Sequence, residues 1–238
     1  MNIAIIPARG GSQRIPRKNI KLFHGRPMIA WSIRAALDSG CFEQVLVSTD
    51  DDEIASIARE HGADTPFVRP PALSDHHSTT GAVMAHAVHW LQQHGLDLKA
   101  ACCLYATAPF LQAKDIQQAL QLFQSKQLDY VFSATRYGFP IQRAFQLDAN
   151  GRVRMFQPEH LLTRSQDLPE AFHDAAQFYW GTTEAWLEQK PVFSKDSAPL
   201  LLPRHRVQDI DTQEDWQRAE LMFSAWQATH DSKEKVIA

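Results

Sequence analysis

Apolar runs alternate with segments of helical periodicity along the first two thirds of the chain. Residues 2–8 and 44–50 are rich in consecutive aliphatic side chains, which is typical of buried strands, whereas residues 28–37 repeat apolar positions at helical spacing. The pattern continues with predicted helices at 51–62, 79–95 and 114–125 and predicted strands at 65–68, 99–107 and 130–135. Such alternation predicts an α/β fold with a Rossmann-like, mostly parallel sheet and helices on both faces. Nucleotide sites in such sheets lie at the carboxyl ends of the strands.

The alternation stops between residues 137 and 173, where the sequence is polar and contains prolines and arginines. Asn150-Gly151 within this stretch is typical of a hairpin turn, so we expect an inserted arm. A strand at 174–181, a helix at 182–189, a strand at 206–211 and a helix at 212–230 are then predicted. With 238 residues and no internal repeat, the chain is expected to form one domain over 1–238 that includes the arm.

The charge of the chain is unevenly distributed. Lys and Arg number 24 against 27 Asp and Glu, yet seven of the cations precede the first acidic residue, Asp38. The net charge of −3 argues against a general nucleic-acid binder, whose basic surface usually shows in the total. The positive charge is therefore local to the N-terminal segment.

The cysteines and the N-terminus bear on the cellular compartment. Cys41, Cys102 and Cys103 are odd in number and lack zinc-binding spacing, so we expect neither a disulfide framework nor a zinc site. They are typical of small apolar residues in a reducing compartment. The N-terminal apolar run ends at Pro7, too early for a signal peptide or a membrane span. We therefore expect a cytoplasmic protein.

A glycine-containing loop follows the first predicted strand. It begins Ala8-Arg9-Gly10-Gly11-Ser12, and Arg14, Arg17 and Lys18 come next without an acidic residue among them. Glycine lacks the Cβ atom that would keep an anion away from backbone N–H groups, and it tolerates positive φ. The loop matches neither the Walker A pattern nor GxGxxG. A solvated surface turn is the alternative, but four cations beside Gly-Gly favour a polyphosphate site.

Two aspartates near the C-terminus are candidate metal ligands. On the strand predicted at 206–211, Asp209 and Asp211 would face the same side, and close carboxylates raise each other's pKa unless a cation intervenes. Mg²⁺ suits such a pair, because it takes one or two protein carboxylates and completes its shell with phosphate and water. Thr212 and Asp215 resemble a capping box for the last helix. The rival metal site, residues 50–52, is better interpreted as the cap of the helix that begins there.

Arg69 and the pair His76 and His77 can each be interpreted as functional residues or as ordinary solvated surface residues. Arg69 follows the short strand predicted at 65–68, and the prolines after it stiffen the loop, so its guanidinium could hold a phosphate or carboxylate bidentately. Taken alone, such a residue is more often a surface arginine. His76 and His77 have no companion at metal-binding spacing and are interpreted as a solvated pair.

Several segments together resemble the nonulosonic acid cytidylyltransferases, the CMP-sialic acid synthetase family. The similarity rests on "IIPARGGSQRIPRKNI", "VSTDDDEIA", "RPPALS", "TAPF" and "IDTQED", in this order and over nearly the whole chain. Within that family, "LYATAPF" and "TRSQDLPEAFHDAAQFYWG" are most similar to members that act on pseudaminic acid. Enzymes for ordinary sialic acid tend to show Gln-Pro-Thr-Ser-Pro where this chain has residues 105–109.

The resemblance implies a nucleotide-diphospho-sugar transferase type of fold and a defined reaction. CTP would activate a nine-carbon nonulosonic acid, giving a CMP-sugar and pyrophosphate, with Mg²⁺ as the cofactor. The arm at 137–173 would be the dimerisation element of a homodimer. Neither nucleic acid nor a membrane is an expected partner. CMP-N-acetylneuraminate and CMP-legionaminate synthetases are the alternatives within the family.

By match of position, the resemblance assigns residues to three parts of the site. For the nucleotide it implies Ala8, Arg9, Gly10, Gly11, Ser12, Arg14, Lys18, Asn19 and Arg69. The catalytic group would be Arg9, Lys18, Asp209 and Asp211, of which the two aspartates hold the metal. For the sugar it implies Tyr105, Thr107, Gln177 and Tyr179, together with Arg143 and Arg164, which the arm can bring towards a neighbour's active site.

Two positions depart from the family pattern. Most relatives carry Lys where this chain has Gln13, so one phosphate-facing charge is missing unless Arg14 supplies it. Ala176 stands where a glycine is expected, which bears on the backbone conformation beside the sugar. A nucleotide-binding regulatory protein without turnover is therefore the alternative from another class. A dinucleotide-dependent oxidoreductase is disfavoured, because GxGxxG and a ribose-binding acid are missing.

Overall fold

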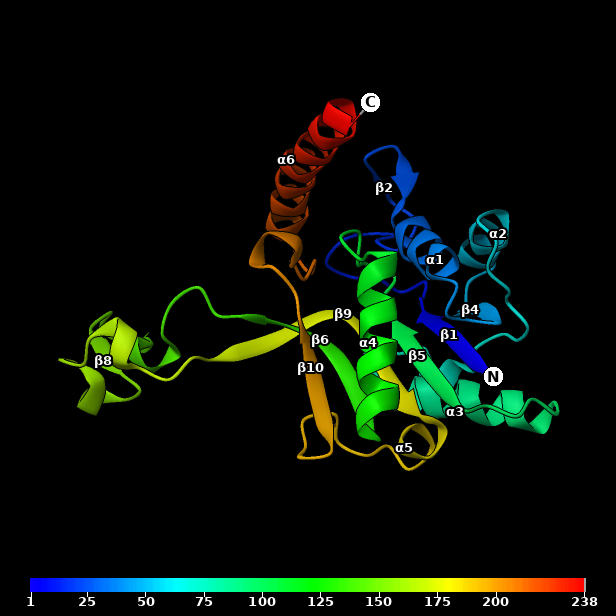
Figure 1. Cartoon of the computed structure of the whole chain (residues 1–238), viewed down its shortest axis with the longest axis horizontal. Helices are drawn as coiled ribbons and strands as arrows, with labels where there is room; N and C mark the ends of the chain where they lie inside the picture. The colour runs from blue at the N-terminus through cyan, green and yellow to red at the C-terminus, as the bar shows by residue number, and fades with distance from the viewer. Residues whose placement is uncertain (238) are drawn as a thin grey trace.

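A six-stranded sheet forms the centre of the molecule. The computed structural model describes the backbone of residues 1–237 and the side chains of residues 1–229. The strand order is β10-β6-β9-β5-β1-β4 (Figure 1). The strands are β1 (Asn2–Pro7), β4 (Gln44–Ser48), β5 (Ala100–Leu104), β6 (Tyr130–Arg136), β9 (Phe172–Thr182) and β10 (Ser197–Leu201). Five strands run parallel and β9 runs antiparallel to both of its neighbours, which confirms the predicted mostly parallel sheet.

Helices cover both faces of the sheet, as predicted. They are α1 (Met28–Ser39), α2 (Asp52–Glu60), α3 (Thr80–Gln93), α4 (Ala113–Lys126), α5 (Thr183–Leu187) and α6 (Gln213–Ile237). α1, α2 and α4 share one apolar core with Ala4 and Ile6 of β1, whereas α3 and α5 pack on the opposite face against Ile3 and Ile5. Because both faces of β1 are buried, its sequence is continuously apolar rather than alternating.

α6 extends the fold beyond the sheet. Its residues Trp216 and Phe223 pack against Phe23 in the small β2 (Leu22–Phe23) and β3 (Arg26–Pro27) hairpin. This third core ties the C-terminal helix to the segment that follows the glycine-containing loop. No helix within residues 1–237 is both long and apolar enough to cross a membrane.

Two of the predicted strands are wrong. Residues 65–68 contribute only an isolated bridge at Val68, and residues 206–211 follow a short 3₁₀ turn at Arg204–Arg206 without joining the sheet. The edge position belongs instead to β10, which pairs in parallel with β6. Pro199 in β10 has no backbone N–H, which an edge strand tolerates. That proline and the half-exposed pattern of β10 conceal the strand in the sequence.

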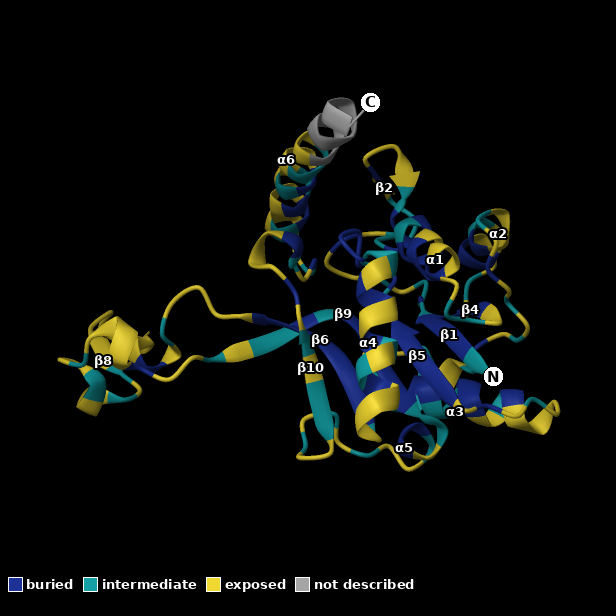
Figure 2. Cartoon of the chain, in the orientation of Figure 1, coloured by how far each residue is buried: buried dark blue, intermediate teal, exposed yellow. Residues whose placement is uncertain are grey.

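An arm projects away from the sheet between β6 and β9 (Figure 1). Its hairpin pairs β7 (Phe145–Leu147) with β8 (Val153–Met155), and the predicted turn is present, with Gly151 at a φ of 74°. Most of the arm is exposed (Figure 2), and this includes many of its large apolar side chains. They are Phe139, Phe145, Leu147, Val153, Phe156, Leu161 and Leu162.

Candidate active site

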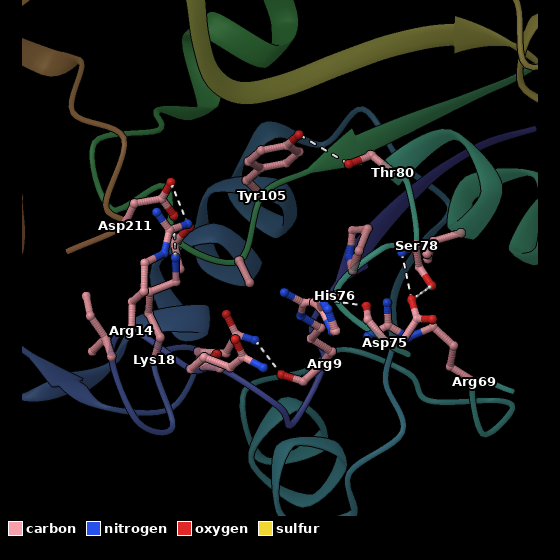
Figure 3. A pocket seen from close by; sticks show the side chains of 18 of the residues that line it. Arg9, Arg14, Lys18, Arg69, Asp75, His76, Ser78, Thr80, Tyr105 and Asp211 are labelled. Carbon is pink, nitrogen blue, oxygen red and sulfur yellow. Dashed lines mark hydrogen bonds and ion pairs between the residues drawn. The ribbon is translucent and has the colours of Figure 1, made fainter. Parts of the chain in front are cut away.

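A cavity of about 550 Å³ lies at the carboxyl ends of β1 and β5, where a nucleotide site was expected (Figure 3). Ten residues assigned from the sequence line it, and they come from the N-terminal loop, the segment between α2 and α3, the end of β5 and the segment before α6. They are Arg9, Ser12, Arg14, Lys18, Asn19, Arg69, Tyr105, Thr107, Asp209 and Asp211. The fold thus brings segments some 200 residues apart into one site.

Position 10 requires a glycine because the side chain of Asp51 lies too close to the backbone there to leave room for a Cβ atom. Its N–H donates to Oδ1 of Asp50 at 3.0 Å, and a Cβ atom at this position would lie 2.6 Å from Oδ2 of Asp51. Neither Gly10 nor Gly11 has a positive φ, and Gly11 faces open space. In this structure a carboxylate accepts the N–H of Gly10, and the expectation that the loop glycines let N–H groups gather around an anion stays a prediction.

The cations of the loop meet acidic residues that come from distant parts of the chain. Arg17 pairs with Asp51 and Glu53 at the start of α2, and Asp51 also caps that helix through the N–H of Ile54, as expected. Arg17 is not among the residues that line the cavity. No acidic residue is close to Arg17 in the sequence, but the fold brings Asp51 and Glu53 to it.

The remaining cations of the loop point into the cavity (Figure 3). Nη2 of Arg14 lies 2.9 Å from Oδ2 of Asp211, and Nζ of Lys18 lies 3.2 Å from Oδ1 of the same residue. Arg9 donates to the backbone carbonyl of Asp75, and no carboxylate among the described side chains lies within ion-pair distance of it. The side chain of Asn19 donates to the Arg9 carbonyl at 3.0 Å and fixes the loop.

Arg69 is buried in the cavity wall with unsatisfied hydrogen-bonding groups. It is only 4% exposed, and its closest carboxylate, Asp50, lies 3.8 Å away. Among the described residues, Nε and Nη2 of Arg69 have no hydrogen-bond partner. Burial lowers the pKa of this guanidinium, and the negative charge of Asp50 reverses only part of that decrease. A buried cation with unpaired donors facing a cavity is suited to an anionic ligand.

Asp209 and Asp211 both line the cavity, although the segment that carries them is not a strand. The loss of water around Asp209 and the charge of Asp211 raise the pKa of Asp209. Lys18 holds the intervening residue by donating to the carbonyl of Ile210 at 2.5 Å. Beyond them, Thr212 and Asp215 exchange hydrogen bonds as the predicted capping box at the start of α6.

A buried ion pair anchors the same segment to the core. Arg206, 5% exposed, makes two hydrogen bonds of 2.5 and 3.1 Å to Asp115 near the start of α4. Gln177 donates to the Arg206 carbonyl at 2.6 Å. Gln177 therefore supports the carboxylate segment and lines neither this cavity nor the adjacent one. No pattern in the sequence indicates that Arg206 pairs with Asp115, because the two residues lie 91 positions apart and only the fold brings them together.

A second cavity, of about 340 Å³, lies beside the first. Thr80 and Tyr105 line both cavities, and their hydroxyl oxygens lie 3.3 Å apart (Figure 3). Tyr179, one of the residues assigned to the sugar, lines the second cavity together with Asp174. The rest of the wall is formed by the aromatic and apolar side chains of Tyr130, Trp186, Val192 and Phe193 and by Thr79, Gly81, Gln189 and Lys190.

Other assigned residues lie outside both cavities. Ala8 is buried, and Gly10 and Gly11 are not part of the lining. Arg143 and Arg164 lie on the arm, where Arg143 donates to Ser165 and to the Leu161 carbonyl and Arg164 pairs with Asp167. A single chain does not bring the two arginines to the cavity.

Sequence reasoning missed a part of the cavity wall that comes from the loop before α3. Asp75, His76 and Ser78 line the cavity (Figure 3), and Asp75 accepts hydrogen bonds from the backbone and hydroxyl of Ser78. His76 is exposed, as expected, but it faces the cavity. No motif marks residues 75–78 in the sequence, and only the fold brings them to the cavity, where the carbonyl of Asp75 accepts a hydrogen bond from Arg9.

Comparisons with known proteins identify the family of the chain. The sequence profile of a family described as cytidylyltransferase matches residues 3–235. A pseudaminic acid cytidylyltransferase from Campylobacter jejuni is 47% identical over 93% of this chain and 96% of its own length. A CMP-N,N'-diacetyllegionaminic acid synthase from Legionella pneumophila is 30% identical over 93% and 95%. The solved structure of a CMP:2-keto-3-deoxy-manno-octonic acid synthetase complexed with CTP is 15% identical and has the same fold, with a TM-score of 0.65 over 94% of this chain and 98% of that one.

Proposed function

Because this chain belongs to the cytidylyltransferase family, we propose that it transfers the cytidylyl group of CTP to a nonulosonic acid, with pseudaminic acid as the acceptor. Family membership confirms the resemblance drawn from the sequence motifs. The observation that carries the proposal is the cavity in which Arg9, Lys18 and Arg69 converge with Asp209 and Asp211. The choice of acceptor rests on the name of the Campylobacter relative.

The cationic wall of the cavity suits a triphosphate. Arg9 and Arg69 both line the cavity and could donate to phosphate oxygens, and charge-assisted hydrogen bonds of this kind are the strong ones. Arg14 also lines the cavity, and its side chain is largely exposed. This supports the idea that Arg14 supplies the phosphate-facing charge that Gln13 lacks.

Mg²⁺ fits the donor set of Asp209 and Asp211. Both are oxygen donors in the cavity, and burial and the charge of Asp211 raise the pKa of Asp209, which the charge of Lys18 offsets only in part. Two protein carboxylates with phosphate and water are a usual shell for Mg²⁺. When bound, the ion would neutralise charge on the triphosphate. Lys18 and Arg14 share Asp211 with the metal and would hold its carboxylate in place.

The proposed reaction is an in-line displacement. The anomeric hydroxyl oxygen of the sugar forms a bond to the α-phosphorus of CTP while the bond from that phosphorus to the bridging oxygen of the β-phosphate breaks. Pyrophosphate leaves and the hydroxyl proton passes to solvent. Arg9 and Lys18 would hold the leaving β- and γ-phosphates, where negative charge develops in the transition state. Most of the acceleration would come from this charge neutralisation and from alignment of the two substrates.

The second cavity is the proposed place of the acceptor. It adjoins the nucleotide cavity at Tyr105 and Thr80, and Tyr179 lies in its wall. Thr107 lines the nucleotide cavity and would lie near the junction of the two substrates. In this arrangement the anomeric hydroxyl of the sugar would lie at the boundary of the two cavities, near the hydroxyl groups of Tyr105 and Thr80, and would face the α-phosphorus.

A homodimer built by the arm is part of the proposal. The apolar side chains on the arm form an exposed patch of the kind that monomeric proteins rarely carry without a partner. Arg143 and Arg164 lie on that arm, so a second copy is the means by which they would reach an active site. The three cysteines are free thiols, in keeping with an enzyme that works in the cytoplasm, where CTP is made.

The test is a product analysis with a panel of acceptors. The protein is incubated with CTP, Mg²⁺ and pseudaminic, legionaminic, N-acetylneuraminic or ketodeoxyoctonic acid, and products are identified by mass spectrometry. We expect the CMP-sugar of pseudaminic acid to form fastest. Preference for legionaminic or N-acetylneuraminic acid would correct the acceptor, whereas CTP binding without any product would favour the regulatory alternative.

A further inference from the structure

The second cavity contains a carboxylate that is held in place by rigid neighbours. Asp174 accepts a hydrogen bond from the Tyr179 hydroxyl through Oδ2 and from the Ala176 N–H, at 2.8 Å, through Oδ1. Tyr179 is 6% exposed. Ala176 has a φ of 50°, a left-handed conformation that is unfavourable for a residue other than glycine. A strained turn and a buried phenol thus fix the direction of the Asp174 side chain.

The charge of Asp174 is not matched by a nearby cation. The other charged residue in the cavity wall, Lys190, is already shared among Asp129, Glu184 and Glu188 at 3.3, 3.0 and 3.8 Å. No Lys, Arg or His with a described side chain lies within ion-pair distance of Asp174. Besides burial, the charge of Asp174 contributes to the raised pKa of Tyr179 and of Asp209.

The two cavities therefore differ in what they offer to a ligand. The first presents cations, among them Arg9 and Arg69, whereas the second presents an uncompensated hydrogen-bond acceptor. Each oxygen of Asp174 has accepted one hydrogen bond and can accept another. A ligand that spans both cavities would place its anionic end in the first and its hydrogen-bond donors in the second.

We propose that Asp174 is a specificity-determining residue that accepts hydrogen bonds from the N–H donors of the acylamino groups at the uncharged end of the acceptor sugar. This inference rests on the proposed function. In an α-keto acid sugar the carboxylate and the anomeric hydroxyl are on the same carbon atom. Anchoring the opposite end at Asp174 therefore directs the reacting hydroxyl towards the nucleotide cavity. Repulsion between Asp174 and the sugar carboxylate disfavours the reversed orientation.

The test compares two acceptors in the variant Asp174→Asn, which keeps the shape of the side chain and removes its charge. For pseudaminic acid we expect the KM to rise about tenfold or more, the effect of losing a charge-assisted hydrogen bond, while the KM for CTP changes less than twofold. For 2-keto-3-deoxy-manno-octonic acid, which has no acylamino group, the KM should rise less than threefold. Glu184→Gln, which removes a carboxylate that faces Lys190, is the control and should change neither value.

Other outcomes would overturn the assignment. Equal increases for the two sugars would mean that Asp174 only shapes the cavity, and unchanged KM values would mean that it does not contact the acceptor. If Asp174→Asn fails to fold, Tyr179→Phe keeps the charge but releases the carboxylate, and the same sugar-selective effect is expected in weaker form. If the wild-type enzyme converts no nonulosonic acid, the proposed function fails and the assignment of Asp174 fails with it. If the wild-type enzyme is active and the selectivity is unchanged, only the assignment fails.

Discussion

Arg69 is a residue that we expect to bind the ligand while contributing little to the stability of the free protein. A buried guanidinium normally has most of its N–H groups paired, yet two nitrogens of Arg69 have no partner among the described residues. Arg69 has one acidic neighbour, Asp50, at 3.8 Å, and that carboxylate is partly exposed, so an apolar residue of similar size at position 69 should cost the free protein little. Arg69 therefore has a weak structural role and a strong expected role in binding.

The variant Arg69→Met should separate these two roles. We expect the free energy of unfolding of the free protein to stay unchanged or to rise by about 1 kcal/mol. CTP should bind at least tenfold more weakly, because charge-assisted hydrogen bonds are lost. Thermal unfolding with and without CTP measures both, and Arg34→Met on the exposed face of α1 is the control. A lower Tm of the free variant with an unchanged CTP-induced shift would contradict this account.

Asp209 gives a prediction about pH. Its pKa is raised above the ordinary 3.8, so the folded state disfavours the charged form, and the residue contributes stability only at low pH. That contribution is lost as the pH rises through the raised pKa. Without metal, Asp209→Asn should therefore have a higher Tm than the wild type at pH 7, and the difference should vanish towards pH 3.5. A difference in Tm that does not depend on pH would argue against a strained carboxylate.

The residues of the site were predictable from the sequence in kind but not in their contacts. Charge alone predicted that Arg9, Arg14 and Lys18 belong to one site, and all three line the cavity. The ion pairs of Asp211 with Arg14 and Lys18 could not be predicted. Asp211 lies 193 residues from Lys18, and only the fold brings them together. Asp174 and the unpaired state of Arg69 were hidden for the same reason.

At the scale of elements, the buried pair of Arg206 and Asp115 joins α4 to the segment that carries the metal-binding candidates. Removal of one partner of such a pair leaves a buried charge alone, at a cost of about 3 to 5 kcal/mol. We expect Arg206→Met to destabilise the protein by about this amount. The double variant Arg206→Met with Asp115→Leu should recover much of the loss.

Urea unfolding of the single and double variants measures these free energies. A double variant that regains stability but not turnover would identify the pair as a positioning device for Asp209 and Asp211. A single variant as stable as the wild type would contradict the buried ion pair. The conservative change Arg206→Lys should retain part of the stability, since Lys can contact Asp115 but cannot form two parallel hydrogen bonds.

The elements themselves were largely predictable, and the exceptions have physical causes. β1 and β5 are buried on both faces, so continuous apolar runs mark them in the sequence. The side chains of Asp51 and Thr79 accept backbone N–H bonds at the starts of α2 and α3 and so cap these helices. β10 was missed because it is a half-exposed edge strand with a proline. Residues 206–211 resembled a strand end but are held by Arg206 and Lys18 rather than by a sheet.

At the scale of the whole molecule, the arm is the feature that a single chain leaves unexplained. Leu162 is 91% exposed and lies among other exposed apolar residues of the arm. If a second copy covers this patch, the variant Leu162→Glu should shift the protein from dimer to monomer in sedimentation velocity. Leu221→Glu, at an exposed position of α6, should leave the dimer intact. A wild-type protein that sediments as a monomer would contradict the proposed dimer.

The arm also marks the limit of sequence reasoning at this scale. The break in alternation at 137–173 and the Asn150-Gly151 turn predicted an insertion, and the hairpin is present. Where Arg143 and Arg164 act cannot be read from one sequence or one chain, because their contacts here are within the arm.

The central claim is that the α-phosphate of CTP moves to an acceptor sugar in the cavity at the carboxyl ends of β1 and β5. Isotopic labels test it most directly: CTP labelled at the α-phosphorus or at the γ-phosphorus is incubated with the enzyme, Mg²⁺ and pseudaminic acid. The account predicts that the α-label appears in the sugar product and the γ-label in pyrophosphate, and that Asp211→Asn slows both by about a hundredfold or more. A γ-label in the sugar, or full activity of Asp211→Asn, would contradict it.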